Sequence, residues 1–194
     1  MVAIADPPTR LDSTPRTAAQ ERILDAALEL IGDHGANGTS LQMIADAIGV
    51  TKAAVYHKYK SKNDIVIALT ERELGLLEDA LEAAEAEPER LQARYLLVSR
   101  LIDIAVARRR WIATLQNDPV IVRLLGEHEP FRVFMSRMYG LLLDEHGDTE
   151  SRVAAAVMTA AIAGSVVNPL VTELDDDTLR ATLLRLTKRV LDLP

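Results

Sequence analysis

The sequence predicts an all-α protein of about nine helices, divided into a small N-terminal three-helix unit and a larger helical C-terminal part. Apolar residues recur at helical spacing along the chain, which places them on one face of each helix. The first such set is Ile23, Ala27, Leu30 and Ile31. The Val- and Ile-rich pieces never alternate polar with apolar residues over the length of a strand, so no sheet is expected.

The N-terminal part divides into an arm and three helices. Residues 1–16 contain three prolines and are expected to form a mobile arm. Helices are expected over 17–33, 41–48 and 52–58, because each begins at a hydroxyl residue that can cap free N–H groups. Glycines after the first two helices stop them. The caps are Thr17, Thr39 or Ser40, and Thr51, and the stopping glycines are Gly35, Gly38 and Gly49.

A long helix is expected over 63–87. Ser61 and Asp64 have the spacing of a capping box, with aspartate in place of the usual glutamate or glutamine, and Pro88 suits the start of the next helix. Further helices are expected at about 89–108, 111–116, 119–125, 130–144, 149–167 and 176–192.

Composition excludes several classes of protein. The chain has no cysteine, which excludes a disulfide scaffold, thiolate metal sites and a cysteine nucleophile. The longest strongly apolar run, 154–167, is too short to span a bilayer. Residues 1–10 lack the basic start and apolar stretch of a secretory signal. We therefore expect a cytoplasmic protein that makes no membrane contact.

Residues 41–59 have the pattern of a helix-turn-helix. Ala45 is small where the second helix must cross closely, Gly49 can adopt the left-handed turn conformation, and Val55 can be buried against the first helix. The second helix then presents its other face outward, as in proteins that place such a helix in the major groove of DNA. A helical hairpin that binds nothing is the alternative. The outward residues are Lys52, Ala53, Tyr56 and His57.

A cluster of lysines coincides with this motif. The net charge of the chain is -7, yet four of its five lysines lie within residues 51–62, a stretch without any acid. A local positive patch of this kind is what a phosphate backbone attracts. Spacing and charge together predict binding to double-stranded DNA. The four lysines are Lys52, Lys58, Lys60 and Lys62.

Residues 17–69 resemble the N-terminal domain of the TetR family of bacterial transcriptional regulators, above all in the stretch GVTKAAVYHKYKSKNDI. The rest of the chain resembles the family only in the number and length of its helices. The resemblance implies a DNA-binding domain over 17–62 and a ligand-binding and dimerisation domain over 63–194, with 63–87 as the connecting helix. It further implies a homodimeric repressor that a small hydrophobic effector releases from a palindromic operator.

The resemblance also assigns DNA contacts to individual residues. Phosphate contacts are implied for Ser40, Tyr56 and Lys62. Base contacts are implied for Gln42, Lys52 and His57, and Ala53 faces the base edges at the start of the second helix. Tyr59 departs from the family, which often has phenylalanine there, so we expect a buried ring whose hydroxyl reaches an edge.

Aromatic and methionine side chains gather between residues 95 and 139. They could line an apolar cavity, the usual kind of site for a hydrophobic small molecule, although an ordinary core would use the same residue types. The resemblance favours the cavity. The candidate lining residues are Tyr95, Trp111, Phe131, Phe134, Met135 and Met138.

The two helices nearest the C-terminus suit a dimer interface. The segment 149–167 carries small residues that let a partner approach closely, and 176–192 carries leucines at helical spacing. An intramolecular core could use either helix. The candidate interface residues are Ala154, Val157, Ala161, Gly164, Leu183 and Leu186.

No catalytic or metal-binding pattern is visible. The four histidines are scattered, and the sequence has neither a glycine-rich phosphate loop nor a nucleophile elbow. We therefore expect no catalytic residue, no metal ligand and no cofactor. Two alternatives to a DNA-binding regulator remain: a helical ligand-binding or scaffolding protein that does not bind DNA, and an unrecognised enzyme.

Overall fold

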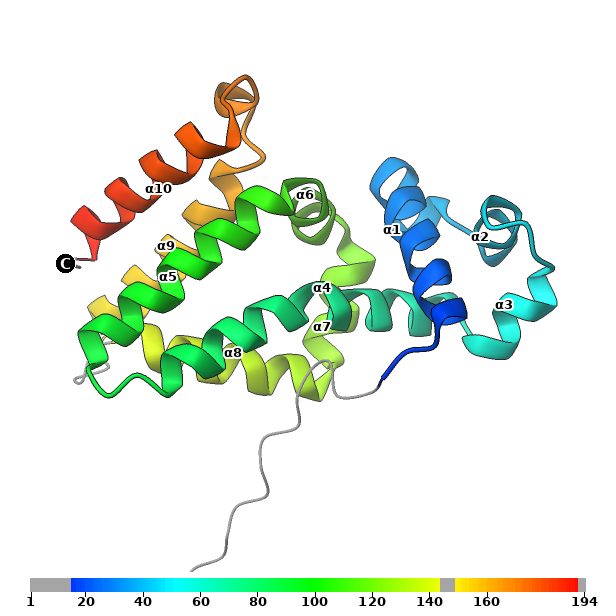
Figure 1. Cartoon of the computed structure of the whole chain (residues 1–194), viewed down its shortest axis with the longest axis horizontal. Coiled ribbons are helices and arrows are strands. Elements are labelled where there is room, and N and C mark those ends of the chain that lie inside the picture. The colour runs from blue at the N-terminus through cyan, green and yellow to red at the C-terminus, as the bar shows by residue number, and fades with distance from the viewer. Residues whose placement is uncertain (1–14, 144–148, 192–194) are drawn as a thin grey trace, which may run out of the picture.

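The computed structural model of the chain describes residues 15–143 and 149–191, with the backbone alone at 115–117 and 151. Its described residues form α-helices joined by short turns, and a single 3-10 turn (Figure 1). This confirms the predicted all-α class. The elements are α1 (Ala18–Gly38), α2 (Leu41–Ala47), α3 (Lys52–Lys58), α4 (Lys62–Glu85), α5 (Arg90–Ala107), α6 (Arg109–Asn117), α7 (Pro119–Glu127), α8 (Glu129–Leu142), α9 (Thr149–Ser165), η1 (Pro169–Val171) and α10 (Asp176–Val190).

The described part of the chain holds ten α-helices. The expected total of about nine was one too low, although each of the ten ranges expected individually corresponds to one of these helices. The expected break between 108 and 111 falls at Arg108, whose φ of -116° and ψ of 25° lie outside the helical range. Residues 1–14 of the expected mobile arm lie outside the described residues. The last residue of that arm, Arg16, is held on α4, where its guanidinium donates to the Ala68 carbonyl at 3.2 Å.

The helices begin where the hydroxyl residues predicted them. Thr17, Ser40, Thr51 and Ser61 each accept a hydrogen bond from the backbone N–H three residues on. At Ser61 the reciprocal bond is present too, because the Asp64 carboxylate accepts from the Ser61 N–H at 3.0 Å. Aspartate therefore completes the capping box as glutamate usually does.

Two glycines turn the chain at the predicted places. Gly35 has a φ of 72° and interrupts α1, and Gly49 has a φ of 69° between α2 and α3. A side chain at either position would be strained in this left-handed conformation. The turn after Gly35 is closed by Thr39, which is buried and donates its hydroxyl to the Gly35 carbonyl at 2.9 Å.

Two hydrophobic cores share the long helix α4, which runs from one part of the molecule into the other (Figure 1). The N-terminal core contains Ile65 and Leu69 of α4, and the core of the C-terminal body contains Leu74 and Leu81. The N-terminal core also takes in residues of α6 and α7, so the two parts are packed together. Those residues are Trp111, Ile121 and Leu125. None of the helices in the described ranges combines the length and hydropathy that crossing a bilayer requires.

Tyr59 is buried as expected, with 7% of its surface exposed, but the expectation for its hydroxyl was wrong. The hydroxyl is buried as well and has no hydrogen-bond partner among the described residues. The ring belongs to the N-terminal core, and its burial takes the hydroxyl away from solvent.

Tyr59→Phe should therefore stabilise the chain, by about 1 kcal/mol, because it removes an unsatisfied buried hydroxyl and keeps the ring. Burial raises the pKa of Tyr59 above 10.0, so the parent chain should lose stability as pH rises past that value, and the variant should lose less. Denaturant unfolding at neutral and alkaline pH measures both effects. Lower stability of the variant at neutral pH would mean that the hydroxyl is satisfied in solution.

Candidate nucleic-acid interface and ligand cavity

The helix-turn-helix packs as its spacing predicts. Ile44, Ala45 and Val55 are fully buried between α2 and α3. The turn between the helices is closed by the Val50 N–H, which donates to the Ala45 carbonyl at 3.0 Å. This packing turns the other face of α3 to solvent, where Lys52, Ala53, Tyr56 and His57 are all exposed.

Ser40 and Gln42 already have partners on α2. The Ser40 hydroxyl accepts from the Met43 N–H at 3.2 Å, so its own proton stays available to a phosphate. The Gln42 amide donates to the Asp46 carboxylate at 2.7 Å, which orients the side chain along the helix and leaves its carbonyl and second N–H to contact a base.

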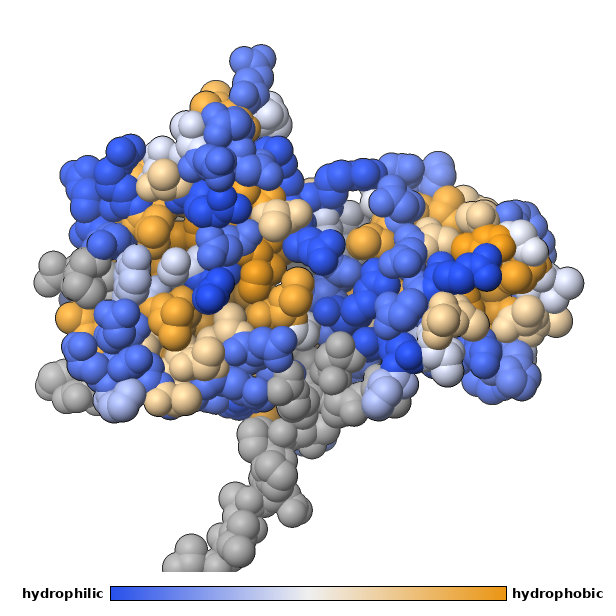
Figure 2. Space-filling model, in the orientation of Figure 1, coloured by the Kyte–Doolittle hydropathy of each residue, from blue (hydrophilic) through white to orange (hydrophobic). Residues whose placement is uncertain are grey.

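Tyr56 has a cation beside its ring. The ring is 53% exposed, and the Lys60 ammonium lies 5.4 Å from its centroid, within the range of a cation–π interaction. The phenol and the ammonium therefore form one exposed group at the C-terminal end of α3. In Figure 2 the surface over α2 and α3, at the right, mixes apolar and hydrophilic residues.

Lys62 has a structural partner that the sequence did not indicate. Its ammonium donates to the Ala36 carbonyl at 2.6 Å, which ties the start of α4 to the turn after Gly35. The same ammonium has two further donors, so a phosphate contact remains possible chemically. The Ala36 N–H is held in turn by the Asp118 carboxylate at 2.6 Å. The Ala36 backbone thus links the head of the molecule, which consists of α1–α3 and the start of α4, to the α6–α7 junction.

Lys62→Ala should weaken binding to all DNA sequences by a similar factor, since a lysine on phosphate carries no sequence information. The slope of log affinity against log salt should fall by about one unit for each subunit. The variant should also unfold at a lower denaturant concentration, because it loses the bond to Ala36. An unchanged salt slope with lower stability would show that Lys62 only holds the turn.

Asp118 has two structural tasks. Its Oδ1 caps α7 by accepting from the N–H groups of Val120 at 2.9 Å and Ile121 at 3.4 Å. Its Oδ2 is the partner of Ala36. Asp118 is 82 positions from Ala36 in the sequence, so the sequence does not indicate this contact. An aspartate before a proline is a local signal, and it predicts only the helix cap.

Asp118→Ala should destabilise the chain by about 2 kcal/mol, because it removes a helix cap and leaves a buried N–H unpaired. Asp118→Asn should lose less, since asparagine keeps an acceptor oxygen. Asp175→Ala is the matched control, because Asp175 caps α10 by the same bond to the Thr178 N–H but makes no long-range contact in the described structure. Equal losses in Asp118→Ala and Asp175→Ala, measured by thermal unfolding, would contradict the link to Ala36.

Ion pairs join the same two parts of the molecule. Arg110 of α6 lies 3.5 Å from Glu29 and 3.2 Å from Asp33 of α1. A hydrogen bond of 2.9 Å also joins His128, between α7 and α8, to Glu71 of α4. The head therefore contacts α6 and the α6–α7 junction, so a displacement of α6 would also affect α1.

The body contains an apolar cavity of about 290 Å³ between α4, α5, α6, α8 and α9. Apolar residues gather over the α4–α5 region on the face shown in Figure 2. Four of the six predicted lining residues line the cavity: Phe131, Phe134, Met135 and Met138. The contribution of α9 was not predicted, and it supplies Thr159, whose hydroxyl lies 3.3 Å from the Tyr139 hydroxyl, a polar pair in the apolar wall.

The other two predicted residues lie elsewhere. Tyr95 faces α10, with the Lys188 ammonium 5.1 Å from its ring centroid. Trp111 belongs to the N-terminal core. A tyrosine or a tryptophan on a helix can line a cavity or pack against another helix. The residue type alone did not distinguish these two placements.

The predicted interface residues fall into two groups. Val157 is 57% exposed and Leu186 is 48% exposed, and Ala161 is exposed too, while Ala154 and Gly164 are half-buried. Leu183 is 8% exposed and belongs to the core of the body, where α10 packs on α5. Val153 of α9 and Val190 of α10, which were not predicted, are exposed as well, at 56% and 65%.

The chain thus combines a packed helix-turn-helix, whose second helix is exposed and acid-free, with a helical body that contains an apolar cavity, and one long helix joins the two. Residues 23–69 match the family described as bacterial regulatory proteins, tetR family. This match covers the helix-turn-helix and the first part of α4, and the rest of the chain lies outside it.

Similar proteins point the same way. The HTH-type transcriptional regulator AcrR of Shigella flexneri is 42% identical over 62 residues, and the match spans 30% of this chain and 29% of that protein. Two solved structures share the fold over most of the chain. FadR of Bacillus subtilis in complex with stearoyl-CoA is 20% identical, with a TM-score of 0.66, over 86% of this chain and 96% of that one. The SmeT–triclosan complex is 24% identical, with a TM-score of 0.66, over 89% and 91%.

Proposed function

We propose that the chain is a homodimeric transcriptional repressor that binds a palindromic operator and is released by a small hydrophobic effector. The observation that carries this proposal is the exposed face of α3, which has no acid and presents Lys52, Ala53, Tyr56 and His57 over a packed helix-turn-helix. In proteins of this class the N-terminal residues of the second helix contact base edges in the major groove.

The seven assigned residues divide by role. Ser40, Tyr56 and Lys62 position the protein on the phosphate backbone, and Gln42, Lys52 and His57 read bases beside Ala53. The free hydroxyl proton of Ser40 and the exposed phenol of Tyr56 support the backbone role. The first turn of α3, with Lys52 and Ala53 side by side and exposed, supports base reading there.

The apolar cavity supports the effector. Aromatic and methionine side chains line it, and one polar pair, Tyr139 and Thr159, could orient a ligand. Solved proteins of the same fold hold stearoyl-CoA and triclosan. A ligand in this cavity touches α4 and α6, and these helices reach the head directly. It can shift operator affinity to the extent that it binds the two states of the protein unequally.

The DNA-binding part of the proposal is tested by selecting bound sequences from a random pool of duplex DNA. We expect enrichment of an inverted repeat whose half-sites lie about one helical turn apart or a multiple of it. Ala53→Glu, which places an acid on the exposed face of α3, should abolish the enrichment, and Ala83→Glu on the exposed side of α4 should not. No enrichment by the parent chain would reject a sequence-specific regulator and favour a ligand-binding or scaffolding protein.

The effector part is tested by filling the cavity. Ala160→Phe places a ring in the wall of the apolar cavity, so it should lower the affinity of hydrophobic molecules such as long-chain fatty acids and triclosan in calorimetric titrations. Its operator affinity without ligand should stay near that of the parent chain. Ala83→Phe, at an exposed position outside the cavity, is the control. Equal ligand affinity in both variants would place the effector elsewhere.

A further inference from the structure

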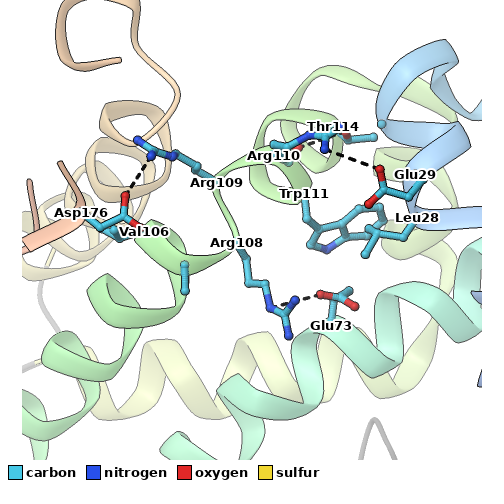
Figure 3. Close-up of a pocket in the computed structure, with 12 residues that line it drawn as sticks. Leu28, Glu29, Glu73, Val106, Arg108, Arg109, Arg110, Trp111, Thr114 and Asp176 are labelled. Atoms are coloured by element: carbon cyan, nitrogen blue, oxygen red, sulfur yellow. Dashed lines mark hydrogen bonds and ion pairs between the residues drawn. The ribbon is translucent and has the colours of Figure 1, made fainter. Parts of the chain in front are cut away.

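A second cavity, about 270 Å³ in volume, lies between the head and the body (Figure 3). Its walls come from α1, α4, the α5–α6 junction and the start of α10. No residue lines both this cavity and the apolar one. The two cavities are nevertheless neighbours. Glu73 and Trp111 line the second cavity, and the next residues in the chain, Leu74 and Ile112, line the apolar one.

Two buried polar atoms in its wall lack hydrogen-bond partners among the described residues. One is the indole Nε1 of Trp111, a donor whose residue is 4% exposed, and the other is Oε2 of Glu73, an acceptor whose residue is 5% exposed. In Figure 3 the indole ring lies between Leu28 and the side chains of Glu73 and Arg108. Buried polar groups in proteins are nearly always hydrogen-bonded, so a donor and an acceptor that both lack hydrogen-bond partners in one cavity point to an occupant.

The charges around the cavity are already balanced. Arg109 lies 2.8 Å from Asp176, and Arg110 lies 3.5 Å from Glu29. Arg108 lies 3.6 Å from Oε2 of Glu73, and the other oxygen of Glu73 accepts from Arg72 at 3.1 Å. Three guanidinium groups thus meet three carboxylates in the lining, and the wall selects neither an anion nor a cation.

What the wall lacks is an acceptor for the indole N–H and a donor for the carboxylate oxygen. A hydroxyl group supplies both, whereas an ether or a ketone can only accept. The rest of the cavity offers apolar surface from Leu28, Val106 and the indole ring. Arg108 is exposed and stands 3.6 Å from Oε2 of Glu73, beyond hydrogen-bond distance, so this oxygen keeps its capacity to accept a hydrogen bond.

We propose that this cavity is a second effector site, for a small uncharged molecule that carries a hydroxyl group on an apolar body, such as a phenol. Its occupant contacts α1 on one side and α4 and α6 on the other, so it bears on the orientation of the head relative to the body. The effect on DNA binding rests on the proposed function, but binding of the molecule does not. The coupling is reciprocal: a tenfold change in operator affinity requires a tenfold change in affinity for the phenol.

Trp111 is the only tryptophan of the chain, so its indole N–H gives a single nitrogen–proton signal in a nuclear magnetic resonance spectrum. Phenol should shift this signal saturably in the direction of a stronger hydrogen bond, and toluene, which has the same shape without the hydroxyl, should not. Equal shifts with phenol and toluene, or no saturable shift with phenol, would overturn the proposal and leave a cavity that holds water.

Variants separate this cavity from its neighbour. Glu73→Gln should weaken phenol binding about tenfold. Gly32→Met tests the same cavity without touching a buried charge, because a Cβ at Gly32 meets only the end of the Arg110 side chain, at 3.9 Å. It should block phenol, and Gly126→Met, where a Cβ meets no atom within 4 Å, should not. Ala160→Phe, which fills the apolar cavity, should leave the phenol shift intact, and loss of the shift in that variant would assign phenol to the apolar cavity.

Operator binding distinguishes the two proposals. If phenol shifts the indole signal and changes operator affinity, the second effector site is supported in full. If it shifts the signal and operator affinity stays constant, the regulatory role of the site is overturned. If phenol shifts the signal of a chain that selects no DNA sequence, the binding site is supported and the proposed function fails.

Discussion

Gly164→Asp is expected to convert the proposed dimer into a monomer and to weaken operator binding by roughly 10²- to 10⁴-fold, because two half-sites are no longer held by one particle. Gly164 lies on α9, two turns after the exposed Val157 on the same side of the helix. A Cβ at this position meets no atom of a neighbouring helix within 4 Å, so the single chain has room for a side chain there. In a dimer the new carboxylate would be buried without a partner, which is strongly destabilising.

Sedimentation of the variant and the parent chain at micromolar concentration measures the change directly. Gly140→Asp is the matched control, since Gly140 of α8 also has open space around its Cβ. The control should sediment as the parent chain does. A Gly164→Asp variant that stays dimeric and binds the operator normally would place the interface on another face, and a parent chain that is monomeric at this concentration would reject the dimer.

Lys52→Ala is expected to cost about 1–3 kcal/mol per half-site at one base pair of the operator and to relax the choice of base there. Lys52 is the first residue of α3 and is exposed, and it makes no hydrogen bond or ion pair in the described structure that would hold it away from DNA. Thr51, which caps the helix, keeps α3 in place when Lys52 is truncated.

Binding to a set of operators with single base-pair changes distinguishes a base contact by Lys52 from general electrostatic attraction to DNA. Lys58→Ala is the matched control, because Lys58 is exposed at the opposite end of α3. It should lower affinity for all operators alike through the salt-dependent term. Unaltered base preference in Lys52→Ala, with the same loss as in Lys58→Ala, would remove Lys52 from the residues that read bases.

The sequence by itself determined the class of fold and the position of the candidate DNA-binding surface. Helix caps, the left-handed turns at Gly35 and Gly49 and the burial of Val55 all depend on residues within a few positions of one another. The interactions are local. A hydroxyl accepts from the N–H three residues on, and a glycine without a Cβ adopts a positive φ without strain. For the same reason the exposed face of α3 could be predicted without any knowledge of the rest of the molecule.

Only the tertiary structure decided how the head meets the body. The Asp118–Ala36–Lys62 link joins residues far apart in the sequence. Trp111 packs in the N-terminal core, and α9 contributes residues to the wall of the apolar cavity. Tyr95 lies against Lys188. Each of these helices has more than one apolar face, and the choice among faces follows from which helices cross and how their side chains fill the space between them. Periodicity indicates that a residue is buried, but its burial partner depends on packing across the whole chain.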